Sequence, residues 1–168
     1  VLTPDDLMDG SRPGGRRVVL FDDDHYYLDG VLAELLAAEG HPVLLVTPAA
    51  DVSAWTHHTL EQRRIAARLL GMGVEIATHQ SVERIEAGGV TTACVFTGRT
   101  TEREAAAVVL VTPRLPNEQL ALDLADRCSG TGGPAPRVSA VGDACAPGTI
   151  AAAVWDGRRF AEELEGPD

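Results

Sequence analysis

Apolar residues in this chain follow two alternating patterns, short continuous runs and positions three or four residues apart, which indicate strands alternating with helices. Residues 17–28 have the pattern of a buried strand, a tight turn and the start of a helix. The helix continues to about Gly40, and a second apolar run follows at residues 42–47. A strand, a helix and a strand within roughly thirty residues form the unit of a parallel, Rossmann-like sheet. The apolar face of the helix is expected to comprise Leu28, Val31, Leu32, Leu35 and Leu36.

Two further helices are predicted from capping signals. Residues 1–15 are expected to be a lead-in with a short helix, which Thr3 can cap and which Pro4 can begin. A later helix is predicted to start with a capping box formed by Thr59 and Gln62. The apolar stripe of that later helix is expected to comprise Ile65, Leu69 and Met72.

The second half of the chain returns to strands. A third strand is expected at residues 74–77, and three short strands at 81–85, 90–96 and 102–105 have the spacing of an antiparallel meander. Residues 106–112 form a continuous apolar run, which predicts a central strand. The predicted fold is therefore α/β, with a Rossmann-like parallel sheet and a meander in a three-layer arrangement.

The C-terminal part is predicted to hold two helices with a strand between them. The first helix runs through Leu120, Leu124 and Arg127, and a strand at residues 138–141 leads into Gly142-Asp143-Ala144. The final helix is expected to bury one face, made of Ile150, Ala153, Val154, Gly157, Phe160, Ala161 and Leu164. The predicted parts of the chain are a lead-in at 1–15, a nucleotide-binding-like domain at 16–128, a Gly/Pro-rich linker at 129–136, and a strand and helix of a second such domain at 137–168.

The turn after the first strand differs from that of a working dinucleotide site. The Rossmann fingerprint needs glycines where this chain has Asp22, Asp24 and Tyr27, and consecutive acids repel the phosphate that a helix N-terminus would attract. The second strand ends at Thr47, without the acid that reads a ribose hydroxyl. Asp51 comes a few residues late. These substitutions predict a nucleotide-binding fold that has lost its pyridine nucleotide.

Composition narrows the possible partners. The net charge of −11 argues against nucleic acid and anionic membrane surfaces as partners. Three widely spaced cysteines offer no zinc or iron–sulfur framework and favour reduced thiols in a cytoplasmic protein. No apolar run reaches membrane-spanning length. The basic residues are all Arg, which suggests a GC-rich bacterial genome, and a first residue other than Met suggests a piece of a longer protein.

Several residue groups have a functional and a simpler interpretation. The acids and histidine at residues 22–25 suggest a Mg²⁺ site, although a solvated turn is the simpler reading. Tyr26 and Tyr27 suit a docking or electron-transfer surface, or only fill the space that a cofactor left. Cys145 is a candidate reactive thiol at a helix start, against inert packing. The pairs His57-His58 and Arg158-Arg159 are expected to be solvated.

Two motifs resemble the glutathione-reductase-like flavoproteins, which have two dinucleotide-binding domains. Residues 111–117 resemble the segment that crosses between those domains, with Pro113 in place of a glycine. Gly142, Asp143 and Ala144 match the motif that ends the last strand of the FAD-binding domain. The resemblance implies that these three residues belong to a flavin- or ADP-type site and that Asp143 accepts a hydrogen bond from the flavin ribitol.

A closer resemblance is to the C-terminal region of the trimethylamine dehydrogenase group, which includes dimethylamine and histamine dehydrogenases. It rests on residues 1–4 and 8–10, the glycine-poor turn, residues 142–147, 150–151 and Gly157. It implies a parent enzyme with a TIM barrel, FMN and a [4Fe–4S] cluster, and with ADP or FAD as a further candidate. Electrons would pass from an amine to an electron-transferring flavoprotein without NAD(P)H.

The expected role of this chain is structural or partner-docking, with no catalytic residue and no cofactor of its own. Two alternatives stay open. In the first alternative, the parent is an enzyme resembling the related 2,4-dienoyl-CoA and enoate reductases, and this domain still binds NAD(P)H through a rebuilt loop. In the second alternative, the domain is a non-catalytic ADP-binding module.

Overall fold

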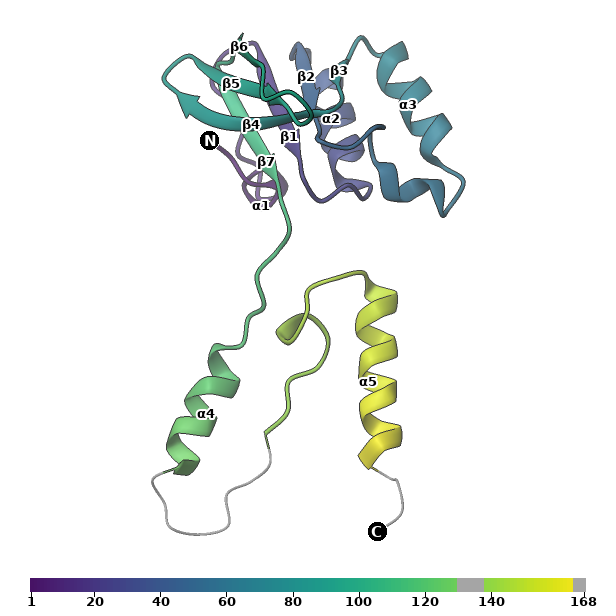
Figure 1. The fold of residues 1–168 in the computed structure, drawn as a ribbon, viewed down its shortest axis with the longest axis vertical. Helices are drawn as coiled ribbons and strands as arrows, with labels where there is room; N and C mark the ends of the chain where they lie inside the picture. The colour runs from purple at the N-terminus through teal and green to yellow at the C-terminus, as the bar shows by residue number, and fades with distance from the viewer. Residues whose placement is uncertain (130–137, 165–168) are drawn as a thin grey trace. The chain divides into compact units, whose positions relative to one another are not determined.

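The computed structural model describes residues 1–129 and 138–164. The chain divides into two compact units, Val1–Thr112 and Pro113–Asp168, which are drawn together in Figure 1. No helix among the described residues is both long enough and apolar enough to cross a membrane.

The first unit is built on a four-stranded parallel sheet with the strand order β3-β2-β1-β7. In the register of the central pairs, Val18 of β1 lies opposite Val43 of β2 and Ala107 of β7. The strands span β1 Val18–Asp22, β2 Val43–Val46, β3 Glu75–Ala77 and β7 Ala107–Val111. A separate antiparallel meander has the order β4-β5-β6, with β4 Gln80–Glu86, β5 Gly89–Cys94 and β6 Thr100–Glu104.

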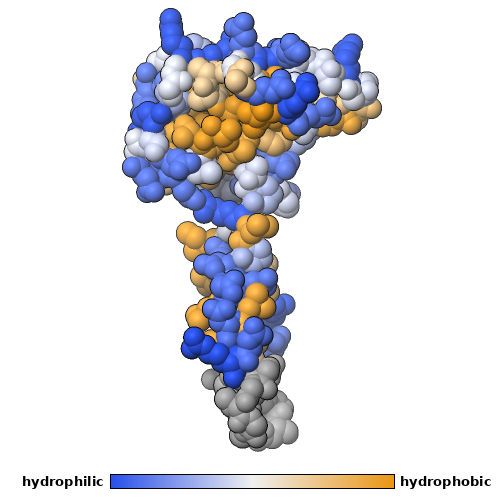
Figure 2. All heavy atoms as spheres, turned by 90° about the vertical axis from the view of Figure 1, so that its left-hand side faces the viewer, coloured by the Kyte–Doolittle hydropathy of each residue, from blue (hydrophilic) through white to orange (hydrophobic). Residues whose placement is uncertain are grey.

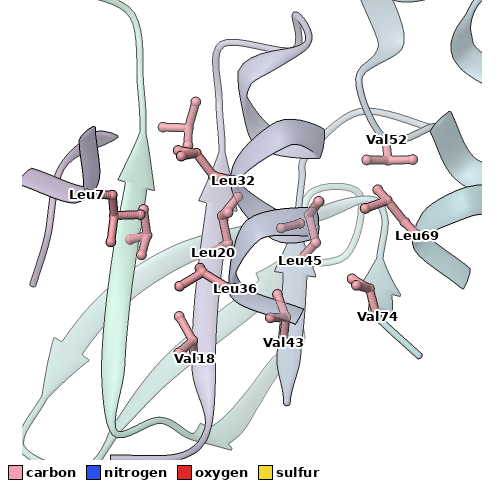
Figure 3. Packing of buried hydrophobic residues seen from close by; sticks show 13 residues of the cluster. Leu7, Val18, Leu20, Leu32, Leu36, Val43, Leu45, Val52, Leu69 and Val74 are labelled. Atoms are coloured by element: carbon pink, nitrogen blue, oxygen red, sulfur yellow. The ribbon is translucent and has the colours of Figure 1, made fainter. Parts of the chain in front are cut away.

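Helices cover one face of the parallel sheet and the meander covers the other, which confirms the predicted three-layer α/β fold (Figure 1). Alternate residues of β1 point to the two faces. Val18 and Leu20 pack with the helices, while Val19 and Phe21 pack with the meander. The helices of this unit are α1 Pro4–Met8, α2 Leu28–Ala38, the 3₁₀ helix η1 Ala54–His57 and α3 Gln62–Gly71. Figure 3 shows the cluster on the helical face.

The N-terminal residues are part of this unit. Thr3 and Asp6 form a capping box for α1, which begins at Pro4 as predicted. Leu7 is buried in the helical cluster, and Leu2 forms a parallel bridge with Val109 of β7. Residues 1–15 therefore contribute to the core and to the edge of the sheet.

Three predictions for this unit are wrong in detail. Strand β7 lies at the edge of the named strands and is not central, and its continuous apolar sequence reflects burial on both faces. On α2, Val31 is 51% exposed, because the residues facing the core are 29, 32, 33 and 36. The capping box at Thr59 and Gln62 is absent. Glu61 precedes α3 instead, and Thr59 donates its hydroxyl hydrogen to the carbonyl of Thr56 at 3.1 Å.

The second unit consists of α4 Gln119–Ser129, the 3₁₀ turn η2 Gly142–Ala144 and α5 Ile150–Leu164. The predicted strand at 138–141 is wrong, since a strand needs a neighbour for its backbone hydrogen bonds and the described residues of this unit include none. Except for Ser129, the predicted linker lies outside the described residues.

The predicted apolar face of α5 is also not buried. Ile150 is 86% exposed, and no residue of α5 is buried. Figure 2 shows hydrophobic residues at the surface of the second unit. The other exposed apolar side chains of this unit include Leu115, Leu120, Leu122, Val154, Trp155 and Leu164.

Candidate functional site

The candidate site lies where β1 and β2 end and α2 begins. Parallel strands end at one edge of their sheet, and ligands of open α/β sheets bind outside that edge. Here the β1–α2 turn, residues 22–27, and the loop after β2, residues 47–57, come together. The backbone N–H of Trp55 in the loop donates to the carbonyl of His25 in the turn at 2.8 Å.

Asp22 closes the turn from the inside. Its side chain is fully buried, and its carboxylate accepts the backbone N–H of His25 at 2.8 Å and the hydroxyl of Thr47 at 3.3 Å. The Nδ1 atom of His25 lies 3.4 Å from Oδ2 of the Asp22 carboxylate. Burial raises the pKa of Asp22 despite these partners. The expectation of a solvated turn is therefore wrong for Asp22, because its side chain is buried and hydrogen-bonded to His25 and Thr47.

A second buried carboxylate belongs to Asp29 in the first turn of α2. It accepts the hydroxyl of Ser53 at 2.7 Å and the backbone N–H of Ser53 at 3.1 Å. Burial, and then the charge of Asp22, raise the pKa of Asp29 to about 7, against the opposing effect of these hydrogen bonds. Two acids thus occupy the positive end of α2 and the end of β1, where the fold otherwise accommodates a phosphate.

Sequence reasoning missed Asp29 and Ser53. The available signal was the spacing of Asp29 from Leu32, Ala33 and Leu36, which places it on the buried face of the helix. An acid at such a position requires hydrogen-bond partners, and Ser53 supplies them from 24 residues away.

The other residues at this edge also have contacts within the first unit. Thr47 bonds to Asp22, as described above, so its hydroxyl is engaged inside the fold. Asp51 is exposed, and its carboxylate lies 3.1 Å from Nε2 of His57. Tyr26 and Tyr27 form an edge-to-face pair with ring centroids 5.3 Å apart.

No ready metal site occurs at this edge. Asp24 is half-buried next to the closed Asp22 turn. Residues 1–129 and 138–164 contain no group of three or more His, Cys, Asp or Glu side chains placed to hold a metal ion.

The Gly142-Asp143-Ala144 turn belongs to the second unit. Gly142 has a φ of 61°, and its N–H donates to the carboxylate of Asp156 on α5 at 2.8 Å. Asp143 is exposed, and its carboxylate accepts the N–H of Gly148 at 3.3 Å. The neighbouring Cys145 is an exposed free thiol. The assignment of this turn to a flavin- or ADP-type site stays a prediction.

Comparison with known families decides where this chain belongs. A family model described as the OYE-like second alpha/beta domain matches residues 2–119. The chain belongs to this family. The matched residues contain the whole first unit, except its first residue, together with the closed turn and both buried acids.

The chain is similar over nearly its whole length to parts of several larger proteins. It is 29% identical to dimethylamine dehydrogenase of Hyphomicrobium sp. (strain x), over 188 aligned positions that cover 100% of this chain and 25% of the relative. It is 45% identical to the solved histamine dehydrogenase from Rhizobium sp. 4-9, with a TM-score of 0.91 over 99% of this chain and 26% of the other. These similarities confirm the predicted resemblance to the amine dehydrogenase group.

A third similar protein is 6-hydroxypseudooxynicotine amine oxidase from Pseudomonas geniculata N1. The identity is 36% and the TM-score 0.89, with coverage of 98% of this chain and 24% of that protein. The chain therefore spans about a quarter of the length of these relatives. It resembles the C-terminal region of amine-dehydrogenase-like flavoenzymes.

Proposed function

We propose that this chain is the second α/β domain of an amine-oxidising flavoenzyme and that its former pyridine-nucleotide site is now a structural part of the fold. The family match and the similarity to dimethylamine and histamine dehydrogenases support the flavoenzyme assignment. The burial of the Asp22 carboxylate within the β1–α2 turn is the observation that supports the loss of the nucleotide.

The electrostatics of the turn argue against a bound dinucleotide. Two unit charges of like sign about 4 Å apart repel by about 1 kcal/mol in water and by about 4 kcal/mol near a protein surface. Asp22 and Asp29 lie at the edge where a pyrophosphate would bind, and Asp23 and Asp24 add charge to the same turn. The residues of this turn therefore do not fit NADH or NADPH.

The parent enzyme supplies the chemistry in this proposal. FMN and a [4Fe–4S] cluster would be held by the part of the parent outside this chain, together with the contacts to the amine. Electrons would leave to an electron-transferring flavoprotein. The exposed apolar side chains of α4 and α5 would pack against the rest of the parent, which is the main partner proposed for this chain.

The second unit has a few groups that suit an ADP- or FAD-type site. The exposed Asp143 carboxylate has acceptor capacity beyond its contact with Gly148, which suits a ribose or ribitol hydroxyl. Gly142 and Ala144 complete that turn ahead of α5, whose N-terminus favours an anion. When bound, such a group would serve as a nucleotide anchor for the parent enzyme.

We further propose that the parent is a bacterial cytoplasmic enzyme.

An anaerobic reductive titration of the full-length enzyme tests the proposed function. The flavin absorbance is recorded in the absence of oxygen during two kinds of titration. In one the added reductant is an amine, such as dimethylamine or histamine, and in the other it is NADH or NADPH. Bleaching by an amine and none by either nicotinamide nucleotide is the expected result. Bleaching by NADH or NADPH, with no response to amines, would replace the proposal with a reductase related to the enoate and 2,4-dienoyl-CoA reductases.

A further inference from the structure

The two buried acids connect elements that are distant in the sequence. Asp22 ends β1 and holds the backbone of His25, while Asp29 on α2 holds both the backbone N–H and the hydroxyl of Ser53. The Trp55–His25 backbone bond joins the same turn and loop a second time. We call the contacts of Asp22, His25, Thr47, Asp29 and Ser53 the carboxylate latch.

Two residues of the latch have a left-handed backbone conformation, with positive φ, that L-residues rarely adopt. His25 has a φ of 62° and Ser53 a φ of 49°. Both residues donate their backbone N–H to a latch carboxylate, His25 to Asp22 and Ser53 to Asp29. Because the two carboxylates maintain these conformations, weakening the latch frees the loop at residues 52–57 to move away from the turn.

Few charges are available to balance the latch. The turn contributes Asp23, Asp24 and His25, the loop contributes Asp51 and His57, and Glu61 precedes α3. Of these groups only His25 has a contact with a latch carboxylate among the described residues. The neighbouring elements offer neutral groups, namely Thr47 after β2, Gln62 on α3, which bonds to the carbonyl of Val52 at 3.3 Å, and the backbone of β7.

We propose that the carboxylate latch is a pH-sensitive switch, in which loss of a proton from the Asp22–Asp29 pair releases the loop at residues 52–57 from the β1–α2 turn. With one proton on the pair, the buried site holds a single negative charge beside His25. Without that proton, the buried carboxylates of Asp22 and Asp29 are both negatively charged, and His25 is the one possible cation beside them. The released loop carries Trp55, and the turn carries Tyr26 and Tyr27, so the switch alters an aromatic surface at this edge.

The direction of the switch follows from the protonation of Asp29. Burial raises its pKa to about 7, and a carboxyl that becomes exposed to solvent returns toward 3.8. Opening is therefore coupled to proton release, and for these two values the opening equilibrium rises about tenfold between pH 6 and pH 8.

Amide hydrogen exchange in the protein that carries this chain tests the switch. The protection factors of the Ser53 and Trp55 amides, corrected for the intrinsic pH dependence of exchange, are measured at pH 6 and pH 8. In the wild type they should fall about tenfold across this interval. In Asp29→Asn they should stay constant, because that side chain has no proton to lose. Asp51→Asn, which alters an exposed acid of the same loop, should behave as the wild type.

Asp22→Asn provides a second test that does not depend on the folding of Asp29→Asn. Burial is the main cause of the raised pKa of Asp29, and this variant removes the charge of Asp22 that raises it further, so the loss of protection should move to lower pH and become smaller between pH 6 and pH 8. Constant protection in the wild type would overturn the proposal. A wild-type-like fall in Asp29→Asn, or in Asp22→Asn if the first variant does not fold, would overturn it as well.

Discussion

Replacing Asp29 by Asn should change how the stability of the protein depends on pH. The pKa of Asp29 is raised in the folded protein from 3.8 to about 7. A carboxyl with a raised pKa binds more protons in the folded than in the unfolded state, so its contribution to stability falls as pH rises from 3.8 to about 7. Asn cannot ionise and lacks this dependence, so the variant should become progressively more stable than the wild type as pH increases.

The size of the effect follows from the two pKa values. Each unit of difference corresponds to about 1.36 kcal/mol, so ionisation of Asp29 costs the folded state about 4 kcal/mol well above pH 7. Between pH 5 and pH 8 the cost grows by roughly 2.5 kcal/mol. The carbonyl of Asn can accept the Ser53 N–H while its NH2 group donates to the Ser53 hydroxyl oxygen, so both contacts can be kept and the pH-dependent difference carries the effect.

Urea unfolding at pH 5 and pH 8, followed by circular dichroism, measures this difference. Relative to the wild type, Asp29→Asn should gain roughly 2.5 kcal/mol between the two pH values. Asp51→Asn is the matched control, since Asp51 is exposed, and it should show no comparable gain. Equal stability differences at pH 5 and pH 8 for Asp29→Asn would refute the argument that burial raises this pKa.

Two pairs of substitutions test the packing of α2 and α3. Gly30→Ala should destabilise the protein by about 1–3 kcal/mol, because the added Cβ would lie 3.0 Å from Cγ2 of Ile65. Gly71→Ala, where nothing lies within 4 Å, should be neutral or slightly stabilising by the same unfolding assay. Leu69→Ala should cost about 2–5 kcal/mol, because Leu69 is fully buried. Leu70→Ala, at a 61% exposed neighbour, should change stability by less than about 0.5 kcal/mol. Equal effects within either pair would contradict the packing described.

The elements of the first unit could be predicted where the local pattern of apolar residues matches their burial in the fold. The continuous apolar runs of β1 and β2 reflect a sheet that is covered on both faces, and the spacing of Leu32 and Leu36 reflects the helix packed on it. The absence of glycine at Asp22, Asp24 and Tyr27 also pointed to an altered turn. These features depend on residues close in sequence.

The features that were missed depend on contacts between distant residues. Hydropathy places an acid on the surface, and although its spacing puts Asp29 on the buried face of α2, the partner that satisfies its carboxylate, Ser53, lies 24 residues away. The position of β7 at the edge depends on which strands pair, which an apolar run cannot specify. In the second unit, the sequence at 138–141 has the strand pattern, but a strand forms only with a neighbouring strand.

The central claim is that this OYE-like domain has replaced its pyridine nucleotide with internal carboxylates. A thermal-shift titration of the full-length enzyme with NADH, NADPH and ADP tests it, with Asp22→Gly/Asp24→Gly/Tyr27→Gly as the comparison variant. A ligand at about a hundred times its Kd would stabilise the enzyme by about 2.7 kcal/mol, which is readily detected. If the pyridine-nucleotide site is lost, the wild type shows no shift with NADH or NADPH, and a shift with ADP alone would indicate only an adenine-nucleotide site. A clear shift of the wild type with either nicotinamide nucleotide would show that the site still binds its nucleotide.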